Sequence, residues 1–87
     1  MQINVWKETI MILNAIKCKD IIMEISENDK KIILKNSNEI FEAVYDDKKE
    51  SFFIKLNEDI IIEHQYQDRF LEIFRDTNFY ECKCKTK

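Results

Sequence analysis

Between residues 21 and 56, apolar side chains recur at every second position in four runs. A period of two is typical of a β-strand that buries one of its faces. The runs cover residues 21–25, 31–35, 40–45 and 52–56, and the segments between them are short and polar. Short connections join antiparallel neighbours in a sheet. The pattern therefore predicts a four-stranded antiparallel meander.

A different period precedes the strands. Trp6, Ile10 and Leu13 recur at helical spacing within residues 4–18, which predicts an N-terminal helix with one apolar stripe. A chain of 87 residues suffices for one small domain. We therefore expect a single α+β domain over residues 1–87, with an antiparallel sheet of four to five strands, an N-terminal helix and a helix in the C-terminal half. The expected order is α-β-β-β-β-α-β, with the helices on one face of the sheet.

The residues after the fourth strand allow two interpretations. Ile62, Tyr66 and Phe70 continue a helical stripe, which favours one long helix directly after that strand. Three consecutive isoleucines at 60–62 favour a fifth strand instead, with a shorter helix behind it. Both interpretations stay open, and the length of the stripe favours the helix. The alternation within Phe79–Cys84 predicts a last short strand.

The chain contains no glycine and no proline. Loops that bind phosphate need glycine, because the backbone must approach the ligand closely and take positive φ. Glycine-rich nucleotide-binding loops and nucleophile elbows are therefore excluded, and we expect no enzyme activity, no catalytic residues and no cofactor. The left-handed positions of turns are expected to fall to asparagine and aspartate, in Asn28-Asp29, Asn36-Ser37-Asn38 and Asn57.

The cysteines bear on the compartment. Three is an odd number, which is a poor fit to a disulfide framework. Because the chain shows no secretory signal and no long apolar run, we expect a soluble, cytoplasmic protein with free thiols. Cys82 and Cys84 share a face of the predicted last strand and are interpreted as small buried side chains.

A minor alternative is a small metal- or thiol-dependent protein that uses Cys18, His64, Cys82 and Cys84. Cysteine and histidine side chains can bind zinc, but Cys82 and Cys84 are separated by only one residue, which is a poor spacing for two ligands of the same ion. No metal site is therefore expected. His64 is the only histidine, and Asp68 would orient its ring from one turn further along the helix if the long helix forms.

Negative charge is concentrated in the middle of the chain. Residues 36–81 hold five basic and twelve acidic residues, a net charge of −7, although the whole chain carries only −3. On a helix, Asp68, Glu72 and Asp76 stand at i, i+4 spacing and form a column of carboxylates about 6 Å apart. Such a column weakens the helix slightly, and its spacing is comparable to that of phosphates along a nucleic-acid strand. It favours contact with a basic partner.

These features predict a small acidic protein-binding protein, and within that class an inhibitor or decoy of a nucleic-acid-handling enzyme. Phage and mobile-element proteins of the anti-CRISPR or anti-restriction type are of this kind. A toxin-immunity protein and a structural or homodimeric subunit are the alternatives, and an exposed Phe53 or Phe79 would serve an interface. Direct nucleic-acid binding and membrane binding are not expected. The candidate partner-binding residues are Glu39, Glu42, Asp46, Asp47, Phe53, Asp68, Glu72 and Asp76.

Overall fold

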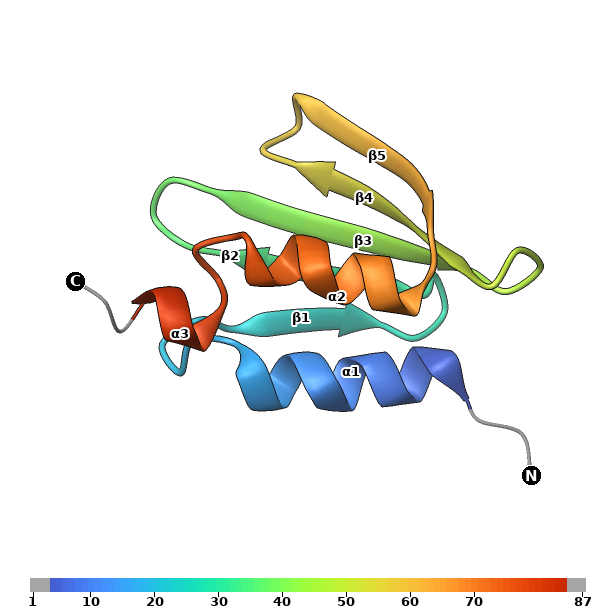
Figure 1. The fold of residues 1–87 in the computed structure, drawn as a ribbon, viewed down its shortest axis with the longest axis horizontal. Coiled ribbons are helices and arrows are strands. Elements are labelled where there is room, and N and C mark those ends of the chain that lie inside the picture. The colour runs from blue at the N-terminus through green and yellow to red at the C-terminus, as the bar shows by residue number, and fades with distance from the viewer. Residues whose placement is uncertain (1–3, 85–87) are drawn as a thin grey trace.

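Five strands form one antiparallel sheet in the order β1-β2-β3-β4-β5 (Figure 1). The structure is a computed structural model and describes residues 4–84. The predicted α+β class, with an antiparallel sheet, an N-terminal helix and a helix in the C-terminal half, is confirmed. Within the described residues the elements are α1 (Val5–Ile16), β1 (Met23–Ser26), β2 (Lys31–Lys35), β3 (Ile40–Asp46), β4 (Ser51–Leu56), β5 (Ile60–Gln65), α2 (Gln67–Arg75) and α3 (Glu81–Cys84).

Helix α1 begins at an asparagine cap. The Asn4 Oδ1 atom accepts a hydrogen bond from the Lys7 backbone N–H at 3.1 Å, which satisfies one of the free donors at the start of the helix. Trp6 and Leu13 are buried, as the apolar stripe predicts. The Trp6 ring stacks on Tyr45 of β3 with the ring centroids 6.3 Å apart. This contact joins α1 to the sheet.

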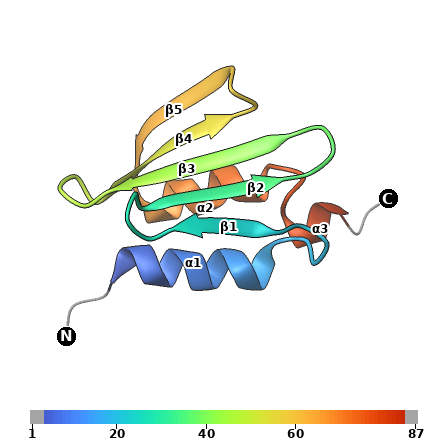
Figure 2. The same ribbon diagram turned by 180° about the vertical axis from the view of Figure 1, so that it is seen from behind.

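The sheet has one packed face and one open face. Helix α2 packs on β3 and β4, and α1 runs alongside β1 in both views (Figure 1 and Figure 2). The view from behind shows the other face of the sheet, over which no helix from residues 4–84 lies (Figure 2). An antiparallel sheet tolerates this arrangement because successive side chains of a strand point to opposite faces. We call the two sides the inner face and the open face.

The core fills the space between the inner face and the helices. Phe41 of β3 and Phe52 of β4 project inward and contact Phe70 of α2. The rings of Phe52 and Phe70 stack with their centroids 4.2 Å apart, and all three side chains are fully buried. Aromatic pairs of this kind contribute about 0.5–1.5 kcal/mol beyond the burial of their area. They hold α2 against the middle of the sheet.

Residues 60–65 form a strand, so the long-helix interpretation is wrong. Strand β5 is antiparallel to β4, with Ile62 opposite Ile54. The hairpin between the strands turns at Asn57 and Glu58, whose φ angles are 53° and 66°. In this position the β-branched isoleucines gain cross-strand neighbours, whereas a helix would restrict their rotamers. The helical pattern of apolar residues holds only within α2, where it begins with Phe70.

The last strand predicted over residues 79–84 is also wrong. Only Tyr80 makes a β-bridge, with Lys17 just after α1, and the short helix α3 follows directly. This part of the chain lies beside the end of a helix, so its alternating side chains have no strand with which to build a ladder. Phe79 is 1% exposed. It therefore belongs to the core and is not the exposed aromatic side chain that the sequence allowed.

Left-handed backbone conformations were expected at three asparagine or aspartate sites, and only Asn57 takes one. The expectation is wrong for Asn28-Asp29 and Asn36-Ser37-Asn38, where no residue has a positive φ. Positive φ angles fall at Lys30, Glu50, Asn57, Glu58 and His64, and only one of these five is an asparagine or aspartate. Lys30 and Glu50 each immediately precede a strand, β2 and β4. The shape of the hairpin fixes that position in the left-handed region whatever residue occupies it. Each non-glycine residue there costs about 1–2 kcal/mol.

Candidate functional site

Helix α2 separates its apolar and acidic residues. Its buried side carries Phe70, Leu71, Ile73 and Phe74, which pack on the inner face of the sheet. Its other side exposes Asp68 and Glu72, and the exposed Asp76 follows at the C-cap. We call Asp68, Glu72 and Asp76 the acidic face of α2. The structure thus brings together the three carboxylates that the i, i+4 spacing predicts.

Basic side chains accompany this face. The Arg69 Nη1 atom donates to the Glu72 Oε2 atom at 3.0 Å, and both side chains are exposed. An exposed pair at i, i+3 contributes at most a few tenths of a kcal/mol and is screened by salt. The Lys83 Nζ atom donates to the backbone carbonyl of Asp76 at 3.4 Å. The acidic face is therefore a moderate negative surface, softened at its centre by Arg69.

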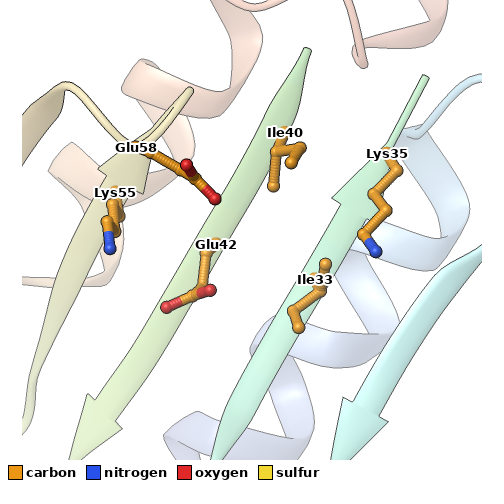
Figure 3. Close-up of a pocket in the computed structure, with 6 residues that line it drawn as sticks. All are labelled: Ile33, Lys35, Ile40, Glu42, Lys55 and Glu58. Atoms are coloured by element: carbon orange, nitrogen blue, oxygen red, sulfur yellow. The ribbon is translucent and has the colours of Figure 1, made fainter. Parts of the chain in front are cut away.

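Glu42 and Phe53, two further predicted residues, lie on the open face. Glu42 stands directly opposite Ile33 of β2 and Lys55 of β4. Together with Lys35, Ile40 and Glu58, these side chains line a hollow of about 170 Å³ (Figure 3). Phe53 is 39% exposed on the same face, opposite Val44. Apolar and charged side chains alternate here, and the hollow is smaller than the roughly 300–1,000 Å³ of a typical small-molecule site.

Two predicted acids make hydrogen bonds within the molecule, Asp46 with nearby backbone and Glu39 with an asparagine side chain. In the β3–β4 hairpin, the Asp46 Oδ1 atom accepts hydrogen bonds from the backbone N–H groups of Lys48 and Lys49 at 2.9 and 3.2 Å. In the β2–β3 loop, the Glu39 Oε1 atom accepts a hydrogen bond from Asn78 Nδ2 at 2.8 Å. These contacts are those of turn and loop anchors.

The predicted residues therefore do not form one surface. Asp68, Glu72 and Asp76 lie together on α2, on the side of the sheet that carries the helices. Glu42 and Phe53 lie on the opposite face, while Glu39, Asp46 and Asp47 belong to loops or strand ends.

His64 is on a strand and not on a helix. Because α2 begins at Gln67, the proposed support from Asp68 one turn later is wrong. The imidazole Nε2 atom lies 3.7 Å from the carboxylate of Glu63 instead, and both side chains are exposed. His64 has a φ of 57° beside a register shift in the β4–β5 pairing, which marks a β-bulge.

The cysteines differ from the sequence prediction. Cys18 is disulfide-bonded and 3% exposed, so the expectation that all three cysteines are free thiols is wrong. Its Sγ atom lies 3.4 Å from the carbonyl oxygen of Asn78. Cys82 is a free thiol and exposed, not the small buried side chain that the sequence indicated. The side chain of Cys84 lies outside the described part. Over residues that the structure describes, no three histidine, cysteine or acidic side chains gather around a possible metal position.

Two tyrosines have shifted pKa values. Burial raises the pKa of Tyr45 above its usual value, and the negative charges of Glu50, Asp47 and Asp46 raise it further. A hydrogen bond with Cys82 raises the pKa of Tyr80. Neither phenol lies on the acidic face of α2, and both stay protonated at neutral pH.

Several exposed aliphatic residues have no distinctive signal in the sequence. Ile60 and Ile61 of β5 are 53% and 55% exposed, and Met11 of α1 and Ile22 before β1 are more exposed still. The only sequence signal for the first pair is an uninterrupted apolar run, which a buried strand would share. Their exposure follows from the position of β5 at the edge of the sheet.

Comparison with known proteins gives no relative. No family model matches the chain, and neither a curated protein nor a solved structure is similar to it. Of the helices in residues 4–84, none is long and apolar enough to cross a membrane.

Proposed function

We propose that this chain is a protein-binding protein that acts as an inhibitor or decoy of a nucleic-acid-handling enzyme, in the manner of anti-CRISPR or anti-restriction proteins. The acidic face of α2 is the contact surface, and its partner is a basic groove that otherwise holds nucleic acid. One observation carries the proposal: Asp68, Glu72 and Asp76 are all exposed on the side of α2 that faces away from the core.

Rigidity supports this function. The aromatic contacts of Phe70 with Phe41 and Phe52 fix α2 on the sheet. The spacing between neighbouring carboxylates is therefore set before binding, at about 6 Å. A preorganised array of charges costs little entropy on association, and complementary charge accelerates the encounter with a basic partner.

The test is charge reversal on the acidic face. The variant D68K/E72K/D76K replaces exposed side chains only, so it should fold like the wild type by circular dichroism. Immobilised wild-type protein is expected to capture a nucleic-acid-binding protein from host lysate, and the variant is expected to lose it. Capture should also weaken as salt rises, because exposed charges are screened.

A matched control separates the surface from the net charge. The variant D20K/E24K/D59K also reverses three exposed acids and changes the net charge by the same six units, but it leaves α2 and the other candidate partner-binding residues intact. Capture by this control at the wild-type level supports the proposal. Equal capture by wild type and by D68K/E72K/D76K would contradict it, and capture of a toxin that does not bind nucleic acid would favour the immunity alternative.

A further inference from the structure

Strand β5 forms an open edge of the sheet. It pairs with β4 on one side, and on its other side no element of residues 4–84 lies next to it (Figure 1 and Figure 2). The opposite edge, β1, runs beside α1. The backbone N–H and C=O groups of a strand point alternately to its two sides, so the outer edge of β5 presents a row of donors and acceptors to solvent. Such an edge is a template for another strand.

The side chains of β5 do not protect this edge. Ile61 projects on the open face, opposite Lys55, and is 55% exposed. Ile60 and Ile62 belong to the inner face, and Ile60 is 53% exposed. Natural edge strands are commonly blocked by charged side chains, proline or a β-bulge, and in β5 these begin only at Glu63 and His64, so that residues 60–62 carry none of them. Apolar surface therefore continues to the edge on both faces of the sheet.

We propose that β5 pairs with β5 of a second copy of this chain, antiparallel and around a two-fold axis, so that the two sheets become one. A strand edge paired antiparallel with its own copy satisfies the requirement of a closed two-fold interface, because each residue contacts its counterpart reciprocally. The axis stands perpendicular to the sheet, which keeps the helices of both copies on the same side. The inference is independent of the proposed function, since it uses no residue of the acidic face of α2.

Charge selects the register of this pairing. A two-fold axis at Ile61 would place Asp59 opposite Glu63 of the second copy, and like charges directly opposite each other are unfavourable. An axis at Ile62 places Glu63 opposite the second copy's Ile61 instead. Lys55 stands opposite Ile61 on the open face. In this register Lys55, Ile61 and Glu63 of the second copy therefore lie in one row across three strands, and the backbone positions of Lys55 and that Glu63 are about 10 Å apart. The structure therefore favours the register centred on Ile62.

The bulge limits the length of the interface. His64 has positive φ and stands beside the register shift of β5 against β4, so the regular ladder ends at Glu63. A standard stable interface buries roughly 1,200–2,000 Å². A contact built on about four residues of each strand is expected to bury less than that. The dimer is therefore reversible and depends on concentration in the micromolar range.

The test is sedimentation equilibrium of the pure protein from low micromolar to near millimolar concentration, with the variant I61E. The wild type is expected to dimerise, and I61E to raise the dimer dissociation constant by about tenfold or more, because in the register centred on Ile62 each new carboxylate would directly face Glu63 of the other copy. Ile61 is half exposed at an edge, so the variant should fold. I61T, which keeps β propensity and adds no charge, should weaken the dimer less.

Met11→Glu is the matched control. Met11 is 72% exposed on α1, and its replacement adds the same charge and removes a similar apolar side chain away from β5. The control should dimerise like the wild type. A protein that stays monomeric at every concentration overturns the inference. So does a dimer that M11E weakens as much as I61E, because the interface would then lie elsewhere. No partner protein enters this experiment, so its outcome is separate from that of the capture assay.

Discussion

Introducing a glycine at residue 50 should stabilise this protein. Glu50 has a φ of 52° at the end of the β3–β4 hairpin and is exposed. A side chain in that conformation costs about 1–2 kcal/mol that glycine does not incur. Glycine in turn loses more backbone freedom on folding, by about 0.5–1 kcal/mol. The difference predicts that E50G raises the free energy of unfolding by about 0.5–1 kcal/mol.

The assay is urea denaturation followed by the fluorescence of the buried Trp6. Since a small protein loses about 1 kcal/mol of stability per molar urea, the midpoint should rise by about 0.5–1 M. Lys30 is a less suitable position, although its φ is 55°, because its Nζ atom lies 5.6 Å from the centre of the Trp6 ring. Replacing it would also remove a cation–π contact of about 0.5–1 kcal/mol.

Two controls make the result decisive. E50A keeps the unfavourable conformation and should leave the midpoint close to that of the wild type. D47G changes an exposed residue of the same loop that has no positive φ, so it should lower stability by the entropic cost of glycine, about 0.5–1 kcal/mol. If E50G is no more stable than the wild type while D47G is less stable, the strain attributed to residue 50 does not exist.

Three further predictions concern the core, the pH dependence and the helix surface. F70A should lower the free energy of unfolding by about 3–5 kcal/mol in the same denaturation assay, because it empties a fully buried site between two aromatic rings. The raised pKa of Tyr45 means that the folded state holds this proton more tightly than the unfolded state. The contribution of Tyr45 to stability should therefore be constant below a pH of about 10 and fall as the pH rises above it, and Y45F should reduce that fall in denaturation curves at several alkaline pH values. R69A/E72A should change the urea midpoint by less than about 0.5 M, because the pair is exposed; a larger loss would mean that the pair has a structural role.

The strands over residues 21–56 could be predicted because their signal is local. A strand with one buried face alternates, and β2, β3 and β4 alternate buried with less buried residues over most of their length. The stretch 60–65 could not be assigned with the same rule. Its isoleucines suit a strand, but their spacing to Phe70 also fits a helix, and only the pairing with β4 separates the two states.

The candidate site was predictable in part for the same reason. The acidic face of α2 depends on the spacing of three residues within one element, so the sequence was sufficient to place Asp68, Glu72 and Asp76 together. Whether Phe53 or Phe79 is exposed depends on which element covers each side chain. The sequence therefore left that choice open, and the structure exposes Phe53 and buries Phe79.

The sequence by itself determined the class of the fold, the boundaries of the central strands and the charge arrangement on α2, because each depends on neighbours within a few residues along the chain. Only the tertiary structure decided which face of the sheet stays open, that β5 is an edge, and which residues take left-handed backbone. Those properties depend on contacts between segments far apart in the chain. For residues such as Lys30 and Glu50, the geometry of the hairpin prevails over the preference of the residue itself.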